Sequence, residues 1–445
     1  MSVNKIVTKK IHFIGIGGIG LSALAKFLHN DGHKISGSDI NQTEITNDLG
    51  RNFDAKITIP HHEEAVLDVD MVIYSAAVRP NNPEYKKAKE LGIELLSRKE
   101  ALKFILGEKE VYAVGGAHGK STTSAMLSAV VPKSNALIGA ISKAFGSNVR
   151  NYPNAKVVFE ADESDESFLN SNPYLAIVTN VEPEHMEYYE YDEERFYNAY
   201  KNFLSLAKIR VINAEDEFLA SLDMQSIKLY PSKDIKNIEF VLVNGEPHTK
   251  FEFLDLGVFE VFGFGDHIAL DAALAILAAL KLGEELEDIR VNLLNYRGIK
   301  KRFDIVQNQE SCVVIDDYGH HPTEIKATMQ SLQTYKELKG FTRLNVIWQP
   351  HKYSRTIDNL QAFVECFDGV DELVLLPIWS AGEIEVDIDL KGAFSRYKLL
   401  MADSVTKEDS VVKVYKDGHI IREYSGGLIV AFGAGDITYQ IRGEY

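Results

Sequence analysis

Cysteine is scarce in this chain, because only Cys312 and Cys366 occur among its 445 residues. The two lie far apart, and neither belongs to a C-x-x-C pair. This excludes a disulfide framework and a cysteine-based zinc site. We expect both thiols to be buried among apolar side chains, and we expect the protein to work in the reducing environment of the cytosol.

Long hydrophobic runs are also absent. The most apolar stretch, residues 269–282, contains Asp271 and is too short to cross a bilayer. The first ten residues carry lysines, but neither an apolar core nor a cleavage signal follows them. We therefore predict no transmembrane segment, no signal peptide and no membrane insertion.

The chain has no excess of basic residues. It contains 48 Lys and Arg against 65 Asp and Glu, which gives a formal net charge of −17. A general nucleic-acid binder needs a basic surface to neutralise phosphates, so the composition argues against a nucleic-acid partner. If the protein binds a phosphorylated ligand, it must do so with local devices.

Apolar, strand-like runs alternate with helical patterns along the chain, which is typical of α/β proteins with mostly parallel sheets. The length suffices for about three domains of roughly 150 residues each. A helical pattern at residues 95–107 and a basic cluster at residues 300–302 mark the boundaries. We predict domains at residues 1–106, 107–301 and 302–445. The strand-like runs are residues 11–14, 71–74, 111–114, 157–159, 175–179, 312–315, 344–348, 373–376 and 428–432.

A glycine-rich turn follows the first strand-like run. Gly15, Gly17 and Gly20 form a G-x-G-x-x-G pattern, and a helical pattern begins directly after it. Such a turn lets backbone amides approach a diphosphate at a helix N-terminus. Asp39 ends the next short strand, where a carboxylate can meet a ribose hydroxyl. The pattern predicts a site for NAD or another nucleotide diphosphate; the alternative is a tight turn that only packs helix on strand.

A second glycine turn follows residues 111–114. Gly119, Lys120 and Ser121 match the end of a phosphate loop, although Val114 stands where the strict motif has glycine. We expect Lys120 to reach the β and γ phosphates of a nucleotide, and Ser121 to ligate Mg²⁺. The alternative, a helix start that happens to contain a lysine, is disfavoured by the preceding strand.

Acidic residues follow the next two strand-like runs. Glu160 comes directly after residues 157–159, and His185 lies among carboxylates beyond residues 175–179. The carboxyl ends of parallel strands share one edge of a sheet, and Mg²⁺ prefers carboxylate oxygens. We therefore predict a magnesium site at this edge. The alternatives are a solvated acidic loop and a structural histidine.

Several stretches of the chain resemble, in order, motifs of the Mur ligase family. They are GIGGIGLSALA at 15–25, YSAAV at 74–78, HGKSTT at 118–123, EADESD at 160–165, DDYGHHPTE at 316–324 and QPHKYSRT at 349–356. The resemblance implies an α/β protein with three domains. These are an N-terminal Rossmann-like domain for a UDP-sugar, a central P-loop ATPase-type domain, and a C-terminal Rossmann-like domain that brings an amino acid and contacts ATP.

The resemblance also implies roles for individual residues. Those implied for ATP are Gly116, Ala117, His118, Gly119, Lys120, Ser121, Thr122, Arg302, Asp317 and Tyr318. Those implied for the UDP-sugar are Gly17, Gly18, Ile19, Gly20, Asp39 and Ser75. The amino acid would meet His320, His351 and Arg355, with Arg355 on its carboxylate. The metal ligands would be Ser121, Glu160 and His185, and the catalytic set would be Lys120, His185, His320 and Arg355.

The chain departs from the family pattern in four places, which are Ala117, Glu184, Lys352 and a stretch where the family has Asn at the positions of Ile268 and Asp271. The last departure is the most serious. Ile268 cannot form a hydrogen bond with an adenine edge. We expect Asp271 to accept a hydrogen bond from the adenine amino group but not to donate one.

The implied reaction is the ATP-dependent ligation of L-alanine to the lactyl carboxylate of UDP-N-acetylmuramate through an acyl phosphate. Mg²⁺, as two ions, and ATP as cosubstrate are implied with it. His320 is the candidate for taking the proton of the amine, and His185 is its rival. The alternatives are a ligase that adds a preformed tripeptide during cell-wall recycling, a nicotinamide-dependent dehydrogenase, and a nucleotide-binding protein without turnover.

Overall fold

The computed structural model describes residues 8–444. These residues form two compact units. Unit 1 comprises the residues up to Lys236 together with Glu252–Phe259 and Leu270–Arg297. Unit 2 comprises Asn237–Phe251, Glu260–Ala269 and the residues from Gly298 onward.

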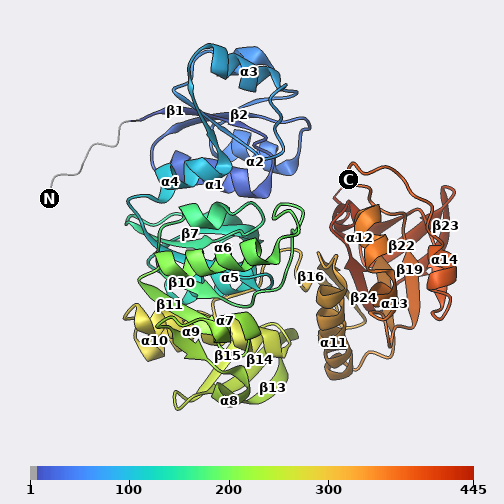
Figure 1. The fold of residues 1–445 in the computed structure, drawn as a ribbon. Coiled ribbons are helices and arrows are strands. Elements are labelled where there is room, and N and C mark those ends of the chain that lie inside the picture. The colour runs from blue at the N-terminus through green and yellow to red at the C-terminus, as the bar shows by residue number, and fades with distance from the viewer. Residues whose placement is uncertain (1–7, 445) are drawn as a thin grey trace. The chain divides into compact units, whose positions relative to one another are not determined.

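Unit 1 begins with a five-stranded parallel sheet of order β3-β2-β1-β4-β5 (Figure 1). The strand order reverses between β1 and β4, and open parallel sheets bind their ligands at the carboxyl ends of the strands beside such a point. The elements of this part are β1 (Lys10–Ile14), α1 (Ile19–Asn30), β2 (Lys34–Ser38), α2 (Glu44–Asn52), β3 (Lys56–Thr58), η1 (Glu63–Val66), β4 (Met71–Tyr74), α3 (Pro83–Glu90), β5 (Glu94–Ser97) and α4 (Arg98–Leu106).

Helices cover both faces of this first sheet because its strands are apolar on both sides. Ile11 and Phe13 of β1 belong to the same core cluster as the buried residues of α1 and α4. Ile14 belongs instead to a cluster with Val72 of β4 and Ala88 of α3. Figure 1 accordingly shows α3 on the face opposite to α1 and α4. This doubly wound arrangement is the one that the run at residues 11–14 predicts.

The second sheet of unit 1 has the order β12-β11-β10-β6-β9-β7-β8, and its neighbours are parallel except for the β7–β8 pair. β6 lies between β9 and β10, so the loops that follow these strands meet at one edge. The strands are β6 (Glu110–Gly115), β7 (Asn135–Ser142), β8 (Ser147–Arg150), β9 (Lys156–Glu160), β10 (Pro173–Val178), β11 (Ile209–Asn213) and β12 (Ile227–Leu229).

Helices and a small sheet complete the middle of the chain. The helices are α5 (Lys120–Val130), η2 (Ser167–Asn170), α6 (Glu193–Leu206), α7 (Glu217–Ser221), α8 (Pro231–Asp234), α9 (Asp266–Lys281) and α10 (Leu286–Leu293). The small sheet has the order β13-β14-β15 and consists of β13 (Ile235–Val243), β14 (Glu246–Phe253) and β15 (Val258–Phe262).

Unit 2 contains a six-stranded sheet of order β16-β17-β24-β18-β19-β20, parallel except for the β16–β17 pair, and an antiparallel meander β21-β22-β23. Its strands are β16 (Asp304–Asn308), β17 (Cys312–Asp317), β18 (Leu344–Trp348), β19 (Glu372–Leu375), β20 (Leu399–Met401), β21 (Ser404–Glu408), β22 (Val411–Lys416), β23 (His419–Tyr424) and β24 (Gly427–Phe432). Its helices from residue 298 onward are α11 (Pro322–Lys339), α12 (Tyr353–Asp358), α13 (Leu360–Val364), α14 (Leu390–Ala393) and α15 (Ile437–Arg442).

The two cysteines and the helices bear on the expectations that the sequence raised about disulfides and membrane spans. Cys312 and Cys366 are both unpaired and buried, as expected. Every helix within residues 8–444 is too short or too polar to cross a bilayer.

A buried charged cluster fastens α15 to the sheet of unit 2. The Asp316 carboxylate at the end of β17 is fully buried and accepts hydrogen bonds from Thr438 Oγ1 at 2.6 Å and Arg442 Nε at 2.8 Å. Arg442 also pairs with Asp304 of β16. Removing one member of such a buried pair leaves an uncompensated charge.

Arg442→Met should therefore lower the free energy of unfolding of unit 2 by about 3–5 kcal/mol. Urea denaturation followed by tryptophan fluorescence measures this loss, because both tryptophans of the chain, Trp348 and Trp379, lie in unit 2. Adding Asp316→Asn should recover part of the loss, since it removes the unpaired charge. An unchanged midpoint for Arg442→Met would show that the cluster does not hold α15.

Candidate functional site

The first glycine turn precedes α1, and its backbone amides could hold an anion at the start of that helix. Gly17 N donates a 2.8 Å hydrogen bond to Asp39 Oδ2. A Cβ on Gly17 would lie 2.8 Å from the same oxygen, so only glycine permits this approach. Gly18, the N-cap of α1, supplies no side-chain cap, which leaves the first amides of the helix to a ligand.

Ser75 lies directly beside this turn. It follows β4, its N donates to Ile14 O at 3.0 Å, and its Cβ would be 3.0 Å from a Cβ on Gly15. The structure therefore brings Ser75 and Asp39 to the turn that carries Gly17, Gly18, Ile19 and Gly20.

The second glycine turn connects β6 to α5 and is held by the end of β10. His118 N donates to Asn180 Oδ1 at 2.9 Å, and Thr179 Oγ1 donates to His118 O at 2.6 Å. Gly116 has a φ of +136°, and a Cβ there would lie 2.1 Å from Thr179 Oγ1. Gly119 caps α5 with a φ of +83° and has no side-chain cap. Free amides at a helix start that follows a buried strand suit a phosphate group.

Lys120, the first residue of α5, points back into the protein. Its Nζ donates to Gly116 O at 2.6 Å, to Ala117 O at 3.0 Å and to Glu163 Oε1 at 3.0 Å. Burial acts to lower its pKa, but the facing carboxylates outweigh burial and raise the pKa above its usual value. Lys120 is therefore a permanent positive charge at the turn.

Glu160, the last residue of β9, faces the phosphate loop. Its Oε1 accepts a 2.9 Å hydrogen bond from Ser121 Oγ, and its Oε2 accepts a 2.7 Å hydrogen bond from Gly139 N. Burial raises the pKa of this carboxyl group. A hydroxyl and a carboxylate side by side are hard oxygen ligands, so this pair fits Mg²⁺.

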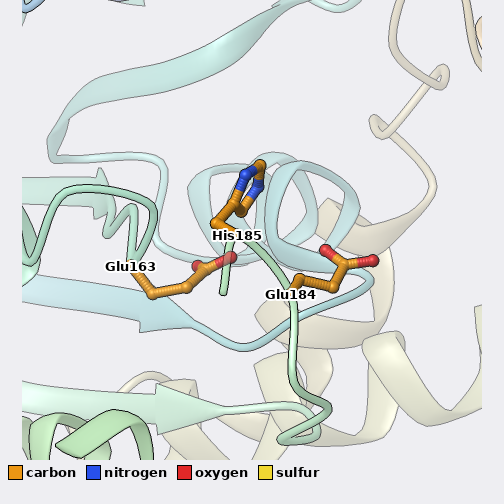
Figure 2. A group of neighbouring side chains, drawn as sticks. All are labelled: Glu163, Glu184 and His185. Atoms are coloured by element: carbon orange, nitrogen blue, oxygen red, sulfur yellow. The ribbon is translucent and has the colours of Figure 1, made fainter. Parts of the chain in front are cut away.

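Glu163, Glu184 and His185 form a second group that could hold a metal ion. Each offers one ligand atom, and these atoms lie within 4.8 Å of one another (Figure 2). Burial raises the pKa of Glu163 to about 7, although Lys120 acts to lower it. His185 has a left-handed backbone with a φ of 54°, a conformation that is uncommon for non-glycine residues. Glu160 is not a member of this group.

A cavity of about 190 Å³ links the first glycine turn to Glu160 within unit 1. Ile19 and Gly20 line it from the turn, and Gly139 and Glu160 line it from the second sheet. Arg98 also lines it, and Arg98 Nη2 lies 3.0 Å from Asp162 Oδ2 and 3.1 Å from Asp165 Oδ1. The wall of the cavity thus carries both the guanidinium group of Arg98 and the carboxylate of Glu160.

Asp271 lies beneath the phosphate loop on α9. A Cβ on Gly119 would lie 2.7 Å from Asp271 Oδ1, so the carboxyl group packs directly against the loop. Burial raises its pKa well above the usual value. That Asp271 only accepts a hydrogen bond from adenine stays a prediction; the raised pKa is a consequence of the burial of the carboxyl group. The sequence could not show this, because the shift comes from tertiary packing.

In unit 2, Arg302, Asp317 and His320 gather around Glu324, a residue to which the sequence analysis gave no role. Arg302 Nη1 lies 2.8 Å from Glu324 Oε1, and His320 N donates to Glu324 Oε2 at 3.1 Å. Asp317 accepts 2.8 Å hydrogen bonds from the amides of Phe303 and Gly319. Although burial acts to raise the pKa of Glu324, Arg302 and His320 keep it below the usual range.

His320, His351 and Arg355 also lie together in unit 2. The rings of His320 and His351 have centroids 6.0 Å apart, and Arg355 Nη1 lies 3.2 Å from His351 Nδ1. The ring of Tyr318 lies against His320, with centroids 5.3 Å apart. Burial lowers the pKa of both histidines to about 4, and Arg355 adds to this shift. Both imidazoles are therefore neutral at pH 7 and able to accept a proton.

Three residues of the site had no role in the sequence analysis: Glu163, Glu184 and Glu324. Glu163 and Glu324 lie inside the family-like stretches 160–165 and 316–324, and Glu184 directly precedes His185. These positions, inside or beside motifs that resemble the family, could have indicated a functional role. Composition alone gives no reason to select these three among the many carboxylates of an acidic chain.

The shift of His320 can be tested directly. At about pH 5.5 an ordinary histidine is mostly protonated, whereas His320, with a pKa of about 4, should remain neutral. The NMR chemical shift of its Cε1 proton, assigned with His320→Gln, measures this state. A midpoint near the usual value of about 6.5 would contradict the burial that is described above.

Family models match successive parts of the chain. "Mur ligase family, catalytic domain" matches residues 10–110, "Mur ligase middle domain" matches residues 114–239, and "Mur ligase, glutamate ligase domain" matches residues 301–415. A UDP-N-acetylmuramate–L-alanine ligase of Campylobacter curvus is 54% identical over 98% of this chain and 100% of its own length. One of Helicobacter pylori is 51% identical over 98% of this chain and 96% of its own length.

Solved structures agree with these matches. A UDP-N-acetylmuramate–alanine ligase of Thermotoga maritima has a TM-score of 0.83 at 28% identity and covers 98% of both chains. A murein peptide ligase of Psychrobacter arcticus has a TM-score of 0.64 at 19% identity, covering 97% of this chain and 96% of its own. The α/β fold class predicted from the sequence is confirmed. The chain belongs to the Mur ligase family and has its three-domain α/β fold.

Proposed function

We propose that the protein joins L-alanine to the lactyl carboxylate of UDP-N-acetylmuramate and converts ATP to ADP and phosphate. The observation that carries this proposal is the 54% identity, over essentially the full length of both chains, to ligases that bear this activity in their names. A tripeptide-adding ligase is less well supported, because the murein peptide ligase that matches in structure is only 19% identical.

We assign the parts of the reaction to three segments. Residues 1–106 bind the UDP-sugar, residues 107–301 bind ATP, and residues 302–445 bring the amino acid and complete the ATP contacts. A cytosolic location stays a prediction that rests on the scarcity of cysteine.

The first glycine turn holds the diphosphate of UDP in this proposal. The amide of Gly17, which now donates to Asp39, turns to a phosphate oxygen, and Asp39 becomes available for the ribose. The cavity lined by Gly20 and Glu160 receives the lactyl end of the sugar. This places the carboxylate that reacts beside the phosphate loop.

The second glycine turn and Lys120 hold ATP. The lactyl carboxylate oxygen attacks the γ phosphorus, the bond from that phosphorus to the ADP oxygen breaks, and an acyl phosphate forms. Lys120 and Arg302 offset the negative charge that gathers during this step. Bound Mg²⁺, as two ions, supplies further charge neutralisation, with Ser121 and Glu160 as ligands of one ion and His185 as a ligand of the other.

The amino acid enters through unit 2. Arg355 binds its carboxylate, and the neutral His320 takes a proton from its amine. The nitrogen then attacks the acyl carbon, the bond from that carbon to the phosphate oxygen breaks, and phosphate leaves. Burial keeps the imidazole of His320 in the unprotonated form, which is the form that accepts a proton.

Phosphate release by the purified protein tests the proposal. ATP, Mg²⁺ and UDP-N-acetylmuramate are supplied with no acceptor, with L-alanine, or with the tripeptide L-Ala-γ-D-Glu-diaminopimelate, and the product mass is measured. We expect release that depends on alanine and a product with the mass of UDP-N-acetylmuramoyl-alanine. Dependence on the tripeptide would assign the chain to recycling, and no turnover with any acceptor would indicate a binding protein.

Arg355→Ala should raise the KM for alanine about 100-fold, because a charged hydrogen-bond pair contributes about 2–3 kcal/mol. The KM for ATP should change little. Steady-state kinetics with each substrate varied in turn measures the split. Arg396→Ala is the matched control, since Arg396 is an exposed arginine of the same unit. An unchanged KM for alanine would remove Arg355 from the amino-acid site.

A further inference from the structure

Lys120 cannot bind a phosphate without giving up a partner. An ammonium group has three N–H donors, and the hydrogen bonds of Lys120 to Gly116 O, Ala117 O and Glu163 Oε1 use them all. Two of these partners are neutral carbonyl groups, but the third is a carboxylate. When a triphosphate draws Lys120 away, Glu163 therefore loses its counter-charge.

Glu163 depends on Lys120 for its counter-charge in the part of the chain that the structure describes. Its side chain is only 1% exposed. Among residues 8–444, Lys120 is the one side chain that donates a hydrogen bond to this carboxylate, and its Nζ lies 3.0 Å from both carboxylate oxygens. A buried carboxylate without a partner is strongly unfavourable. When a nucleotide draws Lys120 away, Glu163, whose pKa burial already raises to about 7, must therefore either take up a proton or gain another cation.

The surroundings of Glu163 offer a place for that cation. Glu184 and His185 each present one ligand atom within 4.8 Å of that of Glu163. Figure 2 shows the three side chains as neighbours. The Tyr200 hydroxyl nearby is buried and has no hydrogen-bond partner among the described residues. After burial itself, the Glu163 charge is the largest influence that raises the pKa of Tyr200. Two carboxylates and an imidazole make a suitable ligand set for a divalent cation.

We propose that Glu163 exchanges one cation for another. It holds Lys120 while the nucleotide site is empty, and it ligates a divalent cation together with Glu184 and His185 once a triphosphate has taken Lys120. The proposal rests on the assignment of Lys120 to ATP. It makes nucleotide binding and metal binding mutually reinforcing, because each removes the obstacle to the other.

Binding of Mn²⁺ to the nucleotide-free full-length protein tests the exchange. Free Mn²⁺ is measured by electron paramagnetic resonance for the wild type and for Lys120→Met, whose side chain has a similar length but no charge. Lys120→Met should bind Mn²⁺ about tenfold more tightly or better, because Glu163 is already free. The double variant Lys120→Met/Glu163→Gln should lose this gain.

The matched control is Lys120→Met/Glu187→Gln, which removes an exposed carboxylate close in sequence to His185. It should keep the gain. Equal Mn²⁺ affinity of wild type and Lys120→Met, or a gain that survives Glu163→Gln, would overturn the proposal. None of these outcomes depends on turnover, so they are distinct from a failure of the alanine-dependent assay.

A second measurement covers the case that Lys120→Met does not fold. Glu163→Gln alone leaves Lys120 in place but removes the charge that retains it. Calorimetric titration with ATP in the presence of EDTA should then give a dissociation constant several-fold lower than that of the wild type. An unchanged or higher dissociation constant would contradict the exchange.

Discussion

The ion pair of Lys120 with Glu163 is the interaction on which the arrangement of the candidate site depends. β6 and β9 run parallel, with Val114 opposite Glu160, so the phosphate loop and the acidic loop leave the sheet at the same level. The side chain of Lys120 bridges the two loops. One ammonium thus neutralises an edge that also carries Glu160, and the charge balance of the edge must change when a polyphosphate arrives.

At both glycine turns, a carboxylate of the protein pairs with the group that is proposed to bind phosphate. At the first turn a carboxylate, Asp39, accepts from the Gly17 amide that is proposed for the diphosphate. At the second turn a carboxylate, Glu163, accepts from the lysine that is proposed for the γ phosphate. In each case a group of the protein occupies the place of the ligand's negative charge. A chain with a net charge of −17 can therefore bind phosphates through exchange of local partners.

The sequence predicted the glycine turns and the strand ends well, because both are local. A buried run, a glycine pattern and a helix start within about ten residues leave few conformations. The residues near Lys120 and Arg302 that the sequence analysis missed depend on distant parts of the chain. Glu163 is 43 positions from Lys120, and Glu324 is 22 positions from Arg302. The raised pKa of Asp271 depends on how α9 packs under Gly119, which no local pattern reveals.

The most direct test of the account follows the oxygen of the lactyl carboxylate. UDP-N-acetylmuramate labelled with ¹⁸O in that carboxylate is turned over with ATP and L-alanine, and the released phosphate is examined by mass spectrometry. If the carboxylate attacks the γ phosphorus, the phosphate must carry one labelled oxygen away. Released phosphate without ¹⁸O would contradict the acyl phosphate and, with it, the role given to the edge around Lys120.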